Sequence, residues 1–192
     1  MKALNALFLM AAIVVLASFT IKDKGYKIDS EKSKITWIGK KVTGQHNGTI
    51  ALAEGTLTSK GKKIDGGSFT IDMTSLKDSE GNARLEGHLK SDDFFSTEKN
   101  PKATFVISKI EPKTGDDYTV TGNLTIKGIT NAIEFPATIQ LSGGQVTAKA
   151  KIIVDRTKFD IKFRSGNFFE NLGDKAIDDN FELNVELTGT EI

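Results

Sequence analysis

Apolar and polar residues alternate from residue 117 to residue 154 with few interruptions. Successive side chains of a β-strand point to opposite faces, so a period of two gives one apolar face and one face in water. Turn-forming residues at 128–131 and at 143–144 divide this region into three stretches. The pattern therefore predicts three consecutive antiparallel strands joined by short turns.

Shorter runs of the same alternation predict further strands at residues 34–38, 49–58, 67–74, 103–110 and 181–188. Because strands from both ends of the chain are available to pair, the expected fold is all-β, a closed antiparallel barrel of about eight strands. A barrel of this size has an interior just wide enough for packed side chains or for one small ligand.

Three segments depart from the alternation. Residues 81–90 carry Leu85 and Leu89 at helical spacing, which predicts a short helix, and we expect one or two short helices in all. Residues 160–179 have little periodicity, and loops of that length are often lids or binding segments. Pro136 falls inside a predicted strand and cannot donate a ladder hydrogen bond, so we expect a bulge or a strand edge there.

The first twenty residues have the composition of a secretory signal peptide. Lys2 gives a positive start, and the apolar stretch 6–19 is too short to span a bilayer. We expect cleavage after a residue between 17 and 20, which leaves 21–192 as a single barrel domain exported across the inner membrane; the alternative is a retained N-terminal anchor. The anchor of a bacterial lipoprotein is chemically impossible, because it needs a lipidated cysteine and the chain has none.

Composition narrows the function classes. The formal net charge is +1, and such a balanced chain has no basic face of the kind that nucleic acid requires. With no cysteine there are no disulfides, so the core alone must hold the fold. Phe supplies 12 aromatic residues against one Trp and two Tyr, which favours an apolar filling or an apolar guest.

Catalysis is poorly supported by the residues present. The two histidines, His46 and His88, do not have zinc-site spacing, and no calcium loop, phosphate loop or nucleophile elbow occurs. We therefore expect no metal, no required cofactor and no enzymatic activity. An enzyme that acts on a prenyl compound, with His46 or an aspartate as base, ranks behind the binding hypotheses.

Four stretches together carry a family resemblance: 122–130 (GNLTIKGIT), 89–95 (LKSDDFF) followed by Pro101 and by Thr104 and Phe105, 155–161 (DRTKFDI), and 46–48 (HNG). They resemble the YceI-like family of periplasmic, lipocalin-like barrels that bind isoprenoid lipids. The resemblance implies an eight-stranded antiparallel barrel with an elongated apolar pocket and a periplasmic location. Where many members have histidines around the first strand, this chain has Lys32 and Lys40–Lys41, and a lysine suits a phosphate better than a quinone.

The candidate ligand site has an apolar wall and a polar end. The expected wall residues are Trp37, Phe69, Ile71, Leu85, Leu89, Phe94, Phe95, Phe105, Ile107, Leu124, Ile126, Phe135, Ile152, Phe159, Phe163 and Phe181. The expected head-group residues are Arg156, His46, Lys40 and Lys41. Arg156 is the preferred one because it adjoins both a strand end and the long irregular segment.

Two hypotheses follow. In the preferred one, an exported, non-enzymatic barrel encloses an isoprenoid lipid, either a prenyl quinone or a polyprenyl phosphate, with transient membrane contact and a homodimer as further possibilities. Since a buried methylene contributes about 0.8 kcal/mol, each isoprene unit would contribute about 3–4 kcal/mol at most. In the alternative, a stress-response or structural barrel has a filled interior and acts through its surface on another protein.

Overall fold

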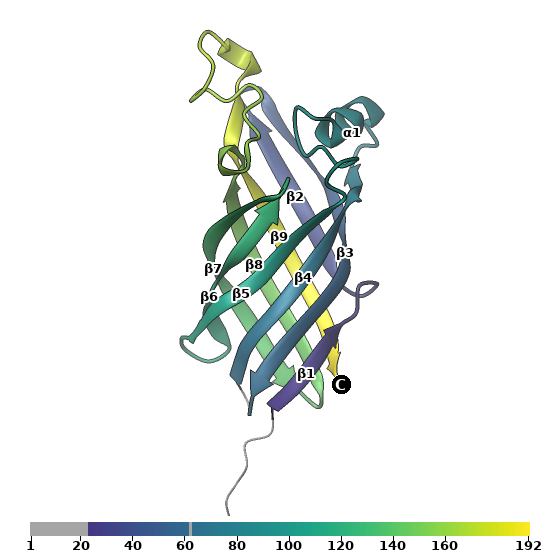
Figure 1. Cartoon of the computed structure of the whole chain (residues 1–192), viewed down its shortest axis with the longest axis vertical. Helices are drawn as coiled ribbons and strands as arrows, with labels where there is room; N and C mark the ends of the chain where they lie inside the picture. Colours follow the sequence, from purple (N-terminus) through teal and green to yellow (C-terminus); the bar gives the residue numbers. More distant parts are fainter. Residues whose placement is uncertain (1–22, 62) are drawn as a thin grey trace, which may run out of the picture.

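The computed structural model describes residues 23–61 and 63–192, so the signal-peptide prediction lies outside the described residues (Figure 1). The strands are β1 (Asp23–Ile28), β2 (Lys34–Lys41), β3 (Gly44–Lys60), β4 (Lys63–Asp78), β5 (Lys102–Pro112), β6 (Asp117–Ile126), β7 (Ile129–Ser142), β8 (Gln145–Asp155) and β9 (Ile177–Glu191). The helices are α1 (Ala83–Lys90) and two 3₁₀ turns, η1 (Arg156–Phe159) and η2 (Gly173–Lys175).

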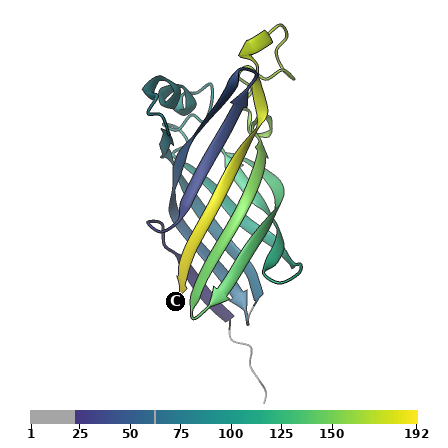
Figure 2. The same cartoon turned by 180° about the vertical axis from the view of Figure 1, so that it is seen from behind.

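The strands form one closed antiparallel barrel, which confirms the predicted fold. Around the ring the order is β2, β9, β8, β7, β6, β5, β4 and β3, and the β2–β3 hairpin completes the circle. Figure 2 shows β9 running between β2 and β8, so the last strand of the chain joins the first part of the barrel to the meander.

β1 was not predicted from the sequence. It pairs with the second half of β3 and with the last residues of β9, and so takes the same place in the ring as β2. Residues 29–33 interrupt this shared position, where Asp29 accepts hydrogen bonds from the amides of Glu31 and Lys32. Only Tyr26 and Ile28 are buried in β1, which is too short an alternation to distinguish from a turn region.

The meander agrees with the sequence except at its first turn. The predicted break at 128–131 is wrong in position, because β7 begins at Ile129 and the turn consists of Lys127 and Gly128 alone. Both turn residues have positive φ, 52° and 74°, as a two-residue type I′ hairpin requires. Pro136 lies just outside the β7–β8 ladder, which starts at Ala137, and pairs with β6 without a register shift. It is therefore at a strand edge and not at a bulge.

The predicted helix and the irregular segment are both present at one end of the barrel (Figure 1). The helix begins after Asn82, whose side chain accepts a hydrogen bond from the amide of Leu85. The irregular segment is shorter than expected because β9 starts at Ile177 and not at residue 181. Lys41 pairs with Ile177 across a register shift in β2, and this irregularity hides the strand start from the alternation.

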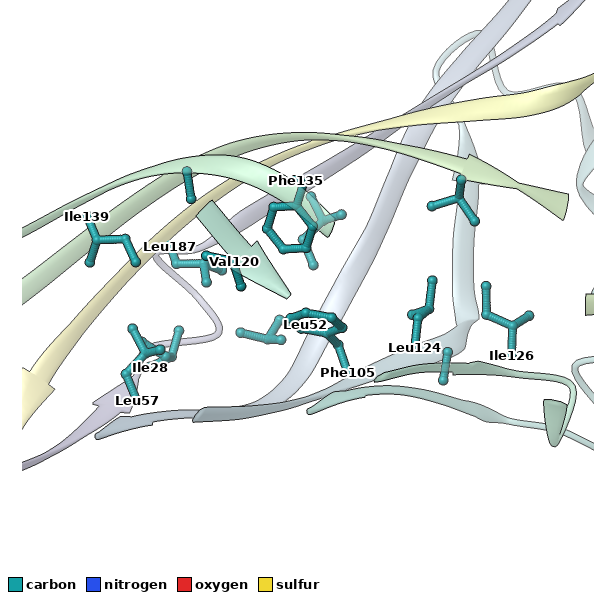
Figure 3. Packing of buried hydrophobic residues seen from close by; sticks show 14 of the residues in the cluster. Ile28, Leu52, Leu57, Phe105, Val120, Leu124, Ile126, Phe135, Ile139 and Leu187 are labelled. Atoms are coloured by element: carbon teal, nitrogen blue, oxygen red, sulfur yellow. The ribbon is translucent and has the colours of Figure 1, made fainter. Parts of the chain in front are cut away.

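The opposite end of the barrel is closed by packed side chains. Figure 3 shows Ile28 and Leu57 close together, with Leu187 and Ile139 beside them. A Cβ on Gly189 would lie 2.6 Å from the carbonyl oxygen of Lys27 and 2.9 Å from Ile28, so β1 and β9 approach each other closely here. Buried apolar side chains therefore pack against one another at this end.

Candidate functional site: an apolar cavity with one polar end

The barrel encloses a cavity of about 260 Å³ whose wall is almost entirely apolar. Each of the strands β2 to β9 contributes side chains to it, and α1 adds Leu85 and Leu89. The rings of Phe69, Phe105 and Phe135 form a row across it, with centroid separations of 6.4 Å between the first two and 5.4 Å between the last two. The interior is therefore neither a water channel nor a fully packed core.

The structure brings together most of the apolar residues expected from the sequence. Those that line the cavity are Trp37, Phe69, Ile71, Leu85, Leu89, Phe94, Phe95, Phe105, Ile107, Leu124, Ile126, Phe135, Ile152 and Phe181. Phe159 does not line it, because η1 turns that side chain into the core, where it is only 1% exposed. Phe163 lies outside the cavity, with its ring centroid 4.6 Å from that of His88.

Several wall residues were missed by the sequence reasoning. Those that share the inward parity of strands that were themselves predicted include Ile35, Met73, Val120, Ile133, Ile139, Leu183 and Leu187, and the alternation could have assigned them. Leu52 and Leu57 also line the cavity, but a register shift in β3 after Leu52 reverses the parity between them, so the alternation could not have assigned both. Ile177, Asp178 and Asn180 could not be found in this way, since they belong to the unpredicted start of β9.

Polar side chains gather at the end of the cavity near α1. All four head-group candidates, Lys40, Lys41, His46 and Arg156, contact the cavity, together with Asp178 and Asn180. Their positions agree with the predicted polar end of the site. The four side chains differ in the hydrogen-bond and ion-pair partners that they have within the protein.

Arg156 is buried and donates hydrogen bonds to backbone carbonyl groups of the protein itself. Its side chain is 4% exposed and donates from Nε to Asp178 O (2.9 Å), from Nη1 to Ile161 O (2.7 Å) and from Nη2 to Ile177 O (3.0 Å). Nη2 also reaches Asp179 Oδ1 at 3.4 Å. Burial lowers the pKa of Arg156, while the carboxylates of Asp179, Asp155 and Asp178 oppose that shift. Because a guanidinium has five N–H groups, a single one is left for a ligand.

Lys40 is also neutralised within the protein. Its ammonium group pairs with Glu182, which Lys151 contacts as well, with an Nζ–Oε2 distance of 2.6 Å. Hydrogen bonds from Lys151 and Lys40 lower the pKa of Glu182 to about 2. The hydrogen bond to Glu182 in turn raises the pKa of Lys40. Lys40 is thus part of the rim and not an open anion site.

His46 faces a buried carboxylate. Its Nδ1 lies 3.9 Å from Asp78 Oδ1, and the Asp78 side chain is only 1% exposed. Asp78 Oδ2 accepts from the amides of Glu80 and Asn82, whereas Oδ1 has no hydrogen-bond partner among the described residues. A proton on Nδ1 would point at this oxygen and leave Nε2 free to accept from a ligand hydroxyl.

β3 and β4 approach each other closely beneath this rim. A Cβ on Gly48 would lie 1.8 Å from the carbonyl oxygen of Lys77 and 2.6 Å from the Trp37 ring. The absence of a side chain lets Trp37 Nε1 donate to Lys77 O at 3.2 Å. Trp37, the single tryptophan of the chain, is therefore held against the cavity wall.

Residues 23–61 and 63–192 contain no group of three or more His, Asp or Glu side chains placed to hold a metal ion. Within those residues, no helix has the length and hydropathy that crossing a membrane requires. The chemistry of the site is thus that of an apolar enclosure with a charged rim.

Comparison with known proteins gives the same architecture. A structure of BcnA from Burkholderia cenocepacia has a TM-score of 0.72 at 26% identity and covers 85% of this chain and 99% of that one. A polyisoprenoid binding domain from Saccharophagus degradans has a TM-score of 0.65 over 86% of this chain and 97% of its own. Its identity is 15%, so this likeness shows the fold alone.

Sequence relatives point to one family. Protein YceI of Escherichia coli is 37% identical over 92 residues, which are 47% of this chain and 47% of that protein. The chain thus spans about half the length of the first curated relatives it matches. The model of the YceI-like domain matches residues 26–189, which include all of β2 to β8 and all of β9 except its last two residues. This chain therefore belongs to the YceI-like family.

Proposed function

We propose that this protein binds an isoprenoid lipid, with the apolar tail inside the barrel and the polar head at the end near α1. The observation that carries the proposal is the apolar cavity of about 260 Å³ within a closed barrel. Buried apolar side chains pack together at one end and the other end is polar, so an amphiphile has a single favourable orientation. The Saccharophagus degradans domain, a polyisoprenoid binding domain of the same fold, supports this ligand class.

Removal of the tail from water supplies the binding energy. An isoprene unit contributes at most about 3–4 kcal/mol on burial, so two to four enclosed units reach micromolar affinity or tighter after the losses of association. The aliphatic and aromatic wall offers few hydrogen bonds, so tail length and shape set the specificity there. We propose a binding role without catalysis, in the periplasm after export.

Entry and release would take place at the polar end. The irregular segment before β9 and the helix α1 both lie at that end (Figure 1). Val42, Phe168 and Phe169 are at least half exposed, and the amide of Val42 donates to Ala176 O within this region. Transient contact of this end with a membrane would let a lipid pass without crossing water.

Native mass spectrometry on gently purified protein tests the proposal, followed by extraction and mass analysis of any released lipid. We expect one bound isoprenoid per chain, and uptake of one prenyl quinone or prenyl alcohol after the lipid is removed. Protein that never carries an isoprenoid and takes up neither compound would refute the proposal.

A further inference from the structure

A row of three phenylalanine rings crosses the interior between the two ends of the barrel. Phe69 of β4 and Phe105 of β5 are stacked with their ring centroids 6.4 Å apart, and the ring of Phe135 of β7 lies 5.4 Å from that of Phe105. All three side chains line the cavity. We call them the phenylalanine row.

Two glycines leave the space in which these rings lie. A Cβ on Gly122 of β6 would be 2.4 Å from Cζ of Phe105, and a Cβ on Gly55 of β3 would be 3.0 Å from Cδ1 of Phe69. Phe105 pairs with Leu124 across the β5–β6 ladder, so its ring leans from the level of Leu124 towards Gly122. Because β6 ends beside the segment after η1, Gly122 lies farther from the polar end than Leu124 does. The Phe105 ring therefore points away from the polar end and lies against the backbone of β6.

The phenylalanine row divides the cavity into two parts, as Figure 3 shows for Phe105 and Phe135. We call the part between the row and the polar end the outer chamber; its labelled wall residues are Leu124 and Ile126. We call the part beyond the row the inner chamber; its labelled wall residues are Leu57, Val120, Ile139 and Leu187. Since residues of both groups line one cavity, the row is a constriction and not the end of the interior.

The two chambers differ in how much of their wall is accessible. Phe181 and Leu183, near the start of β9 in the outer chamber, are half-buried, whereas Leu187 further along the same strand is buried. Leu57 and Ile139 of the inner chamber are buried as well. The inner chamber is thus a narrow space between packed side chains, and the outer chamber is the part that a ligand can fill.

Building on the proposed function, we propose that the phenylalanine row sets the longest prenyl tail that the barrel encloses. A tail that enters from the polar end fills the outer chamber and then meets the rings. Each ring is packed against strand backbone or against a neighbouring ring, so moving it aside costs those contacts. Isoprene units in excess of the outer chamber remain outside the barrel and add no burial. The ligand class is therefore a prenyl compound whose enclosed tail is short.

Isothermal titration calorimetry with a series of prenyl alcohols tests the role of the row. Geraniol, farnesol, geranylgeraniol and geranylfarnesol have tails of two, three, four and five isoprene units. For the unmodified protein, we expect the dissociation constant to fall at least about tenfold with each enclosed unit and to stay constant once the tail reaches the row. This limit should lie at or before about four units, the range in which tail burial supports micromolar binding or tighter.

Matched variants separate the row from the rest of the wall. Phe105→Ala removes the central ring and joins the two chambers, so the limit should move to a tail at least one unit longer, and that tail should bind at least about tenfold more tightly than it binds the unmodified protein. Phe105→Leu, a milder change, should move the limit in the same direction and serves if Phe105→Ala does not fold. Leu124→Ala is the control, because it widens the outer chamber and leaves the row in place; it should weaken the binding of every alcohol and leave the limit unchanged.

Each other result has a distinct meaning. Affinity of the unmodified protein that still rises from four to five units overturns the inference, and so does an unchanged limit in the folded Phe105 variants. A limit that moves equally in Leu124→Ala shows that the width of the cavity and not the row selects the tail, which also overturns the inference. In all these cases prenyl alcohols bind, so the proposed function stands. If none of the alcohols binds the unmodified protein, the proposed function fails together with the inference.

Discussion

Filling the cavity with a side chain should abolish lipid binding and leave the fold intact. Ala150 is suited to this change because it lies on β8 opposite Ala137 of β7 and Val185 of β9, and all three residues line the cavity. In Ala150→Phe, the added ring would enter a space of about 260 Å³ instead of displacing packed neighbours. Overpacking of a filled core costs about 1–3 kcal/mol, and here we expect less than about 1 kcal/mol.

The effect on binding should be much larger than the effect on stability. A phenyl ring occupies about the space of one isoprene unit, so the ligand would lose about 3–4 kcal/mol of tail burial. That loss corresponds to a dissociation constant for farnesol higher by a factor of about 10² to 10³. Calorimetric titration gives the constant, and urea denaturation gives the free energy of unfolding of the same sample.

Thr147→Phe is the matched control, because Thr147 lies on the same strand and points outward, where it is exposed. This variant should bind farnesol as the unmodified protein does. A folded Ala150→Phe protein with unchanged affinity would contradict the placement of the tail in the barrel. Equal losses in both variants would show that the substitution acts through something other than the cavity.

Three further predictions concern the rim and the strands that support it. Gly48→Ala should lower the free energy of unfolding by about 3 kcal/mol, because the new Cβ would overlap Lys77 O and the Trp37 ring. The control Gly87→Ala, in open space on α1, should raise the free energy of unfolding slightly. Urea denaturation measures both variants, and equal effects would be inconsistent with the close approach of β3 and β4. Arg156→Gln should lower the free energy of unfolding by about 3 kcal/mol, because it leaves buried carbonyl groups without a hydrogen-bond donor. Amide hydrogen exchange should then increase first at residues 177–179. Unchanged protection of these amides would refute the role of the Arg156 hydrogen bonds in holding this segment. Glu182 stabilises the fold at pH values above its ordinary pKa of 4.5, and this contribution is lost as the pH falls towards its folded pKa of about 2. Between these two pH values, the free energy of unfolding of the unmodified protein should fall more than that of Glu182→Gln. Identical profiles of the free energy of unfolding against pH would disprove the pairing of Glu182 with Lys40 and Lys151.

The barrel and most of its inward face were predictable from the alternation, because a closed antiparallel sheet has a period of two throughout. β1 was missed because its two buried residues are flanked by lysines, which leaves too short an alternation to recognise. The start of β9 was missed because Asp178, Asp179 and Asn180 are three consecutive polar residues, which do not alternate with apolar ones. The alternation that places Phe105 inward does not decide whether the rings meet and fill the interior or leave a cavity.

The rim was less predictable than the wall. Arg156 was chosen from its position at a strand end, but its bonds to the carbonyls of residues 161, 177 and 178 depend on how a distant segment folds back.

A crystal structure of the protein after incubation with a prenyl alcohol tests the central claim most directly. The account predicts continuous density for the tail inside the barrel, in contact with Phe105, Leu124 and Phe181, with the hydroxyl towards His46. Density on the outer surface only, or an interior closed by the protein's own phenylalanine rings, would contradict it.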